Sequence, residues 1–239
     1  MMDAKTPAAA KLPQKQTIID AATLILIDRT GPVPKVLLGR RHQGHSFMPD
    51  KFVFPGGRVE PIDRLMPAAS PLDPRAEARL MRHAVRPSPA KARAMALAAI
   101  RETFEETGLL IGSRRNIPPK TPGGAWAAFA EAKVHPELAG MHFIARAVTP
   151  PRLTRRYDTR FFTIDAQAVG HRVDGVVGPN AELVELVWLP IAETARLDLA
   201  TITGVVLRAL DLRIQAGLDH DEPVPYYYMA RGRFRRDLL

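Results

Sequence analysis

Cysteine is absent from this chain of 239 residues. Disulfides, thiolate zinc sites and cysteine nucleophiles are therefore excluded, and the absence fits a reducing compartment. The first residues lack the apolar core of a secretory signal, and the longest apolar run, residues 21–27, is far too short to cross a bilayer. We expect a cytoplasmic protein with no membrane partner.

Acidic residues are fewer than basic ones, 25 against 34, which gives a formal net charge of +9. A basic surface suits nucleic acid, an anionic membrane or a phosphorylated small molecule, although a solvated arginine-rich surface explains the charge equally well. No motif of a known nucleic-acid-binding module occurs in the sequence, so we do not expect nucleic acid as the partner. A small phosphorylated molecule stays open.

Apolar residues are not scarce: they make up 46% of the chain, enough for the core of one large domain. The 22 prolines exceed the roughly 5% background and lie between the apolar segments, which indicates ordered pieces joined by stiff loops. We expect a flexible segment at 1–15, one folded domain at 16–217 and a C-terminal tail at 218–239.

The apolar segments predict strands at residues 18–27, 35–41, 52–54, 141–148, 159–164 and 183–189. Helices are predicted at 75–83, 89–107 and 199–216, with a short one near 126–134. Asp73-Pro74 and Ser88-Pro89 each place a capping residue before a proline at the first helical position, and Gly108 suits a helix end. Because strands and helices are mixed rather than strictly alternating, we expect an α+β fold.

Three glutamates lie near the end of the helix predicted at 89–107. Positions three and four apart share one helix face, so Glu102, Glu105 and Glu106 converge, and Arg101 is placed to pair with Glu105. Carboxylates this close repel each other unless a cation neutralises them, and hard divalent cations prefer oxygen ligands. Taken alone, the pattern is more often a solvated acidic face.

A glycine pair, Gly56-Gly57, follows the short apolar strand predicted at 52–54. Two glycines let the backbone bend sharply and approach a ligand closely, so a main-chain carbonyl or N–H could face a metal or a phosphate. Taken alone, a plain β-turn is the better explanation of the pair.

Together, these segments resemble the two halves of the Nudix hydrolase motif, Gly-x5-Glu-x7-Arg-Glu-U-x-Glu-Glu-x-Gly-U, in which U is apolar. Gly57 matches the first glycine. The second half is matched at the family's spacing by Arg101, Glu102, Glu105, Glu106, Gly108 and Leu109. Two positions depart from the motif: Asp63 stands where glutamate is usual, and Thr103 occupies an apolar position.

The motif is also interrupted, because Asp63 and Arg101 lie 38 positions apart where the family has eight. We expect the insertion, at 64–88, to bulge out as a helix without moving the carboxylates. A long insertion here resembles the peroxisomal coenzyme A diphosphatase branch of the family. The resemblance covers roughly residues 18–195.

The resemblance implies an α/β/α sandwich around a mixed β-sheet, with a helical insertion within the motif and an extra C-terminal helix. It implies a pyrophosphohydrolase that cleaves a nucleoside diphosphate linked to another moiety, with coenzyme A or an acyl-CoA as one candidate substrate. A nucleotide-sugar or dinucleotide diphosphatase is the alternative enzyme. A Nudix-fold module that binds a nucleotide or RNA without hydrolysis is the alternative of another class.

The same resemblance implies Mg²⁺ or Mn²⁺ as cofactor. Glu102 and Glu106 would be the main metal ligands and Glu105 a third ligand or a base. The carbonyl of Gly57 would be a backbone ligand, and Arg101 would orient Glu105.

Many family members take a further glutamate from a late strand or loop, and Glu182 and Glu185 are the candidates here. On a regular strand they point to opposite faces, so we favour one of them, Glu182, although an exposed strand-edge charge explains both. Arg58 and Arg160 are the candidates for binding the substrate's phosphates, followed by Arg40 and Arg41.

The C-terminal tail is aromatic, then basic, with Tyr226, Tyr227, Tyr228, Arg231, Arg233, Arg235 and Arg236. Such residues could stack on adenine or nucleic acid. A homodimer contact or a disordered end explains them more simply.

Overall fold

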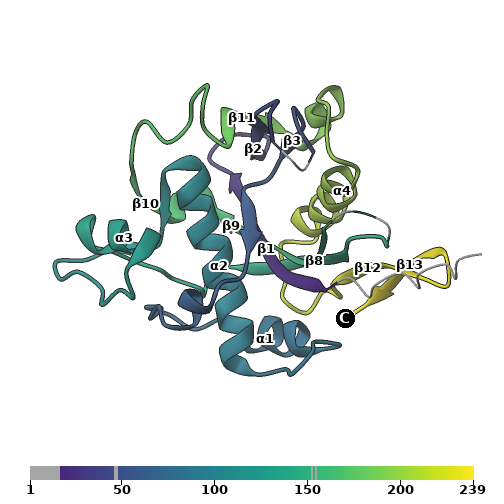
Figure 1. Cartoon of the computed structure of the whole chain (residues 1–239), viewed down its shortest axis with the longest axis horizontal. Helices are drawn as coiled ribbons and strands as arrows, with labels where there is room; N and C mark the ends of the chain where they lie inside the picture. Colours follow the sequence, from purple (N-terminus) through teal and green to yellow (C-terminus); the bar gives the residue numbers. More distant parts are fainter. Residues whose placement is uncertain (1–16, 46–47, 152, 154) are drawn as a thin grey trace, which may run out of the picture.

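A nine-stranded mixed β-sheet forms the centre of the computed structural model, which describes residues 17–45, 48–151, 153 and 155–239 (Figure 1). The segment 1–15, expected to be flexible, lies outside these residues. The strand order is β11-β2-β1-β9-β8-β12-β13, with β3 on β2 and β4 on β1. The strands are β1 (Ile18–Asp28), β2 (Lys35–Arg41), β3 (Phe52–Val53), β4 (Gly56–Arg58), β8 (His142–Val148), β9 (Arg156–Asp165), β11 (Leu183–Pro190), β12 (Pro225–Ala230) and β13 (Arg233–Leu238). The pairs β1–β9 and β8–β12 are parallel and the others antiparallel, so the sheet is mixed, as predicted.

Helices cover both faces of this sheet. Leu24 and Leu26 of β1 belong to one core cluster, which also contains Leu97 of helix α2 (Pro89–Thr107). Ile25 and Ile27 point to the other face and pack in a second cluster with residues of helix α4 (Thr201–Gln215). This alternation along one strand confirms the predicted α/β/α sandwich. None of the helices in the described part of the chain is long and apolar enough to cross a membrane.

The remaining elements are short. Helix α1 (Pro74–Met81) lies in the expected insertion and packs on α2, and helix α3 (Ala127–Glu131) follows a single turn at Gly124–Trp126. Strands β5 (Leu109–Ile111) and β10 (Val169–Arg172) form one small sheet, and β6 (Ser113–Arg114) and β7 (Val134–His135) form another.

Helix α2 has the limits that its capping residues predict. The hydroxyl of Ser88 accepts a hydrogen bond from the N–H of Lys91, Pro89 begins the helix, and Gly108 ends it with a φ of 76° in the left-handed region. Helix α1 begins after Asp73 as predicted and ends at Met81, two residues early, because Arg82 is extended and His83 has a φ of 53°.

The glycine pair lies in a strand rather than in the predicted turn. Gly57 pairs with Ala22 and Gly56 with Thr23 of β1, whose first half is free because β2 pairs with β1 only near Ile27. A Cβ on Gly56 would lie 2.6 Å from the carbonyl oxygen of Ala22, so this close approach requires glycine.

The expected tail is part of the central sheet. Strand β12 pairs in parallel with β8, and β13 pairs with β12 to form the sheet edge. Val224 and Leu239 are 1% and 4% exposed and join the core cluster under α2. Residues 218–239 are therefore integrated with the domain rather than lying outside it.

Candidate active site

The two halves of the interrupted motif meet at the guanidinium of Arg101. Its Nε donates to Asp63 at 2.8 Å, and its Nη2 donates to Asp63 at 3.1 Å and to the carbonyl of Arg58 at 2.8 Å. Asp63 is fully buried. Because it contacts Arg101, the chain comes back after the insertion to a point beside the one at which the insertion begins. The insertion leaves the residues on either side of it in contact.

The same arginine holds two of the three helix carboxylates. Its Nη1 donates to Glu102 at 2.9 Å and also to Glu105. The sequence predicts this pairing of Arg101 with Glu105. Glu106 lies on the side of α2 that faces β4, where it accepts a hydrogen bond from the N–H of Gly56 at 3.2 Å. A Cβ on Gly57 would lie 2.5 Å from the Glu102 carboxylate, so β4 lies directly against both acids.

Burial disfavours the charged form of two of these carboxylates, and the nearby arginines do not fully offset it. It raises the pKa of Glu102 to about 7, an effect that Arg101 opposes and that the charges of Glu105 and Glu182 reinforce. Burial and the charge of Glu182 raise the pKa of Glu106 well above its usual range, and Arg41 only partly offsets them. The site thus holds more negative charge than its own arginines compensate.

Glu182 lies beside this cluster and Glu185 does not. The carboxylate of Glu182 is 3.1 Å from Nε2 of His45 and 3.7 Å from Arg41. Glu185 instead pairs with Arg40, which also binds Asp50. A register shift in β11 between Leu183 and Glu185 accompanies this division.

The oxygen ligands that this site offers are of the type that a hard divalent cation prefers. The site contains the carboxylates of Glu102, Glu105 and Glu106, with the backbone of β4 against them, and it carries uncompensated negative charge. Among the residues that the structure describes, no group of three or more histidine, aspartate or glutamate side chains already surrounds one point as a finished metal cage. Glu102 and Glu105 both pair with Arg101.

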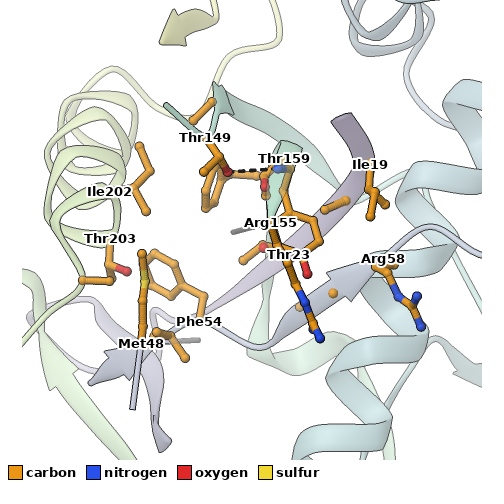
Figure 2. Close-up of a pocket in the computed structure, with 18 of the residues that line it drawn as sticks. Ile19, Thr23, Met48, Phe54, Arg58, Thr149, Arg155, Thr159, Ile202 and Thr203 are labelled. Atoms are coloured by element: carbon orange, nitrogen blue, oxygen red, sulfur yellow. Dashed lines mark hydrogen bonds between the residues drawn. The ribbon is translucent and has the colours of Figure 1, made fainter. Parts of the chain in front are cut away.

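A cavity of about 1180 Å³ opens from the acid cluster (Figure 2). Arg58, with a side chain 62% exposed, lines it, as does Arg155 from the loop between β8 and β9. Figure 2 shows the Arg155 side chain reaching past Thr23 into the cavity. No described residue pairs with the Arg155 guanidinium, which leaves it open to an anionic ligand.

Arg160 does not reach this cavity. Its side chain is 1% exposed and pairs with Asp20 at 2.7 Å and Asp158 at 3.1 Å, on the sheet face that α2 covers. The sequence-based assignment of Arg160 to the substrate therefore does not match its position, because these acids already occupy its guanidinium. Of the weaker candidates, Arg41 lines the cavity and Arg40 does not.

Two cavity residues were missed from the sequence, His45 and Arg155. His45 follows β2 in a polar loop, and a titratable side chain in a glycine-containing loop beside a strand end is the signal that could have found it. Arg155 directly precedes β9, which gave no stronger signal than the other arginines of a basic chain.

Solved structures resemble this chain over most of its length. A Nudix hydrolase from Alicyclobacillus acidocaldarius is 27% identical, with a TM-score of 0.61 over 84% of this chain and 96% of that one. The Nudix domain of Shewanella oneidensis NrtR complexed with ADP-ribose is 14% identical, with a TM-score of 0.46 over 84% of this chain and 90% of that one. A Caenorhabditis elegans Ap4A hydrolase is 13% identical, with a TM-score of 0.41 over 82% of this chain and 98% of that one. The last two likenesses are too weak to carry an argument.

The sequence matches no protein-family model and no curated protein. The likeness to the Alicyclobacillus enzyme therefore stands beside the site geometry as the ground for classification. The fold is the Nudix fold, and this likeness supports a place for the chain among the Nudix hydrolases, which are hydrolases of diphosphate bonds.

Proposed function

We propose that this protein is a metal-dependent pyrophosphohydrolase that cleaves a nucleoside diphosphate linked to another moiety. The observation that carries the proposal is the pair of carboxylates, partly buried Glu102 and buried Glu106, held against the glycines of β4 without enough positive charge. Such an arrangement is unfavourable in a folded protein unless a cation binds there.

Glu102, Glu106 and the backbone carbonyl of Gly57 would hold Mg²⁺ or Mn²⁺, with Glu105 as a third carboxylate. A bound divalent cation would neutralise charge on the diphosphate and lower the pKa of an attacking water. Arg101 keeps Glu105 and Glu102 within reach of the site and links them to the buried Asp63.

Glu182 is the residue best placed to accept the proton of the attacking water. It lies in the cavity, beside Glu106, and Arg41 and His45 fix its carboxylate. A general base must lie within hydrogen-bond reach of its water, and among the two late glutamates only Glu182 faces the cavity. Arg58 and Arg155 would bind the diphosphate oxygens.

Coenzyme A or an acyl-CoA is our first candidate substrate, on the ground of the insertion within the motif. Nucleotide sugars and dinucleotides are the alternative. No described residue of the insertion at 64–88 lines the cavity, so contacts that set specificity would come from the segments that do line it, such as the loop that carries Arg155.

The test uses a panel of diphosphate compounds with Mg²⁺ or Mn²⁺, comparing wild type with Glu106→Gln and Glu185→Gln. We expect metal-dependent turnover that Glu106→Gln abolishes and Glu185→Gln preserves, because Glu185 lies outside the cavity. Hydrolysis of coenzyme A to phosphopantetheine and adenosine 3′,5′-bisphosphate would fix the substrate class. Absence of metal-dependent turnover on every compound would refute the enzyme and favour a binding module. Full activity of Glu106→Gln would refute the site.

A further inference from the structure

The cavity has one charged end and one uncharged end. The lining residues with a carboxylate, guanidinium or imidazole group come from the end of β2 and the loop after it, from β4 and Glu60, from α2, from Glu182 just before β11 and from Arg155. The lining contributed by α4, β8, β12 and β13 contains no charged side chain. Figure 2 shows Ile202 of α4 and Phe54 on one side of the cavity, with Arg155 and Arg58 on the other.

The uncharged end holds the hydroxyls of Thr201, Thr203 and Tyr228 beside a group of large apolar side chains. We name this group the apolar annex: Phe54, Phe161, Ile202, Val205, Tyr227 and Phe234. Phe234 stacks on Tyr227 with ring centroids 5.9 Å apart and is still 60% exposed. A large aromatic side chain held in place yet exposed at a cavity is typical of a binding surface.

The cavity is also large. The cavity measures about 1180 Å³, whereas pockets for drug-sized ligands occupy roughly 300–1,000 Å³. The annex continues the space next to the acid cluster, so a ligand whose diphosphate lies at the charged end extends into it.

We propose that the apolar annex binds a hydrocarbon chain attached to the diphosphate substrate. The inference rests on the proposed function and adds the class of the substrate's second moiety. A nucleobase fits the annex less well, because its ring donors and acceptors would lose hydrogen bonds to water, and the lining offers a few hydroxyls but no amide side chain to replace them. A hydrocarbon chain needs no polar partner and gains from the burial itself.

The C-terminal hairpin β12–β13 thereby becomes a specificity element. It supplies Tyr227 and Phe234, and α4 supplies Ile202 and Val205. Neither segment belongs to the interrupted motif that carries the acids.

The first arm of the test needs no turnover. The full chain is titrated with the fluorescent hydrocarbon probe 1-N-phenylnaphthylamine, and n-decanol is used to displace it. We expect saturable binding that weakens at least tenfold in Ile202→Asp and in Phe234→Ser. Leu212→Asp, on the same helix but outside the cavity, and Glu106→Gln should bind as wild type does. Thermal melts of each variant check that it folds. No saturable binding, or equal binding by Ile202→Asp, overturns the inference.

The second arm compares acetyl-CoA with octanoyl-CoA in the presence of Mg²⁺. Each buried methylene favours binding by up to about fourfold, and roughly twofold for each of six more should raise kcat/KM about 100-fold. Ile202→Asp should lose this gain and keep turnover of acetyl-CoA. Hydrolysis independent of chain length overturns the inference and leaves the proposed function standing. If neither thioester is hydrolysed, the proposed reaction on coenzyme A fails, and the probe alone decides the inference.

Discussion

Glu182 and Glu185 are three residues apart, but their carboxylates lie in different surroundings. The first lies in the cavity against His45 and Arg41, and the second lies outside it against Arg40. A general base contributes roughly 10²–10⁴ to the rate, so we expect Glu182→Gln to lower kcat by that factor. Steady-state kinetics at saturating Mg²⁺ measure the effect.

Glu185→Gln is the matched control for this prediction, with the same chemical change three residues along the chain. It should change kcat by less than about twofold, because an exposed pair contributes little. Equal losses in both variants would show that the position of Glu182 has no catalytic meaning.

Gly57 lies against the Glu102 carboxylate with no room for a methyl group between them. In Gly57→Ala the new Cβ would displace the end of a flexible side chain rather than backbone, so folding should survive. We expect the Mg²⁺ concentration for half-maximal activity to rise by roughly 10–100-fold, as when a metal ligand loses its positioning. A metal titration of activity, run alongside a thermal melt, checks this. An unchanged metal requirement would contradict the placement of Glu102 at the cation.

At the level of whole elements, the insertion depends on one buried ion pair. Arg101 of α2 and Asp63, before α1, have side chains only 4% and 0% exposed, and they join the chain across the interruption. Asp63→Ala would leave the buried Nε of Arg101 without its partner, while Nη1 keeps Glu102 and Glu105, so we expect the fold to lose about 3 kcal/mol. Urea unfolding measures this.

Asp198→Ala is the comparison, because Asp198 pairs with Lys51 with its own side chain 69% exposed. Its loss should lower the free energy of unfolding by at most about 1 kcal/mol. If the two variants unfolded at the same urea concentration, the Asp63–Arg101 pair would not be what closes the insertion.

The C-terminal hairpin is an element that the sequence analysis placed outside the domain. Truncation after Gly217 would remove Val224, Tyr227 and Leu239 from the core and expose the edge of β8. An exposed strand edge with apolar neighbours favours aggregation. We expect the truncated chain to be insoluble or to lose its cooperative thermal transition, measured by circular dichroism. A soluble, cooperatively melting truncation would contradict the integrated sheet.

Across the whole molecule, the sequence predicted what local signals determine. Ser88-Pro89 and Gly108 mark both ends of α2 because capping acts within one turn, and helical periodicity alone puts Glu102, Glu105 and Glu106 near one another. These signals were enough to locate the acid cluster, whereas the α/β/α sandwich was predicted from the resemblance to the Nudix motif.

The features of the fold that depend on contacts between distant segments could not be predicted from the sequence. The strand at Gly56–Gly57 exists because β2 leaves the first half of β1 unpaired. Arg160 is buried because Asp20, distant in sequence, approaches it across the parallel pair β1–β9. Neither relation has a signature within a short window of sequence.

The charge balance of the whole domain gives the last prediction. Without metal, the burial of Glu106 disfavours its charged form, and the nearby Glu182 and Glu102 add repulsion, so this carboxyl group destabilises the folded state at neutral pH. We expect Glu106→Gln to raise Tm in chelator by roughly 2–4 °C, since about 1 kcal/mol corresponds to that shift at this size.

Mg²⁺ should raise the Tm of wild type more than the Tm of Glu106→Gln. A ligand that binds only the folded state at 100 times its Kd stabilises by about 2.7 kcal/mol, which is roughly 5–10 °C for wild type. Glu106→Gln should lose most of this gain, while Glu185→Gln keeps it because Glu185 lies outside the cavity. Sodium chloride at matched ionic strength separates specific binding from screening. An equal rise in Tm for wild type and Glu106→Gln would mean that the cation binds elsewhere. A rise confined to the chains that keep Glu106 would show that the metal binds the same carboxylate whose burial destabilises the metal-free fold.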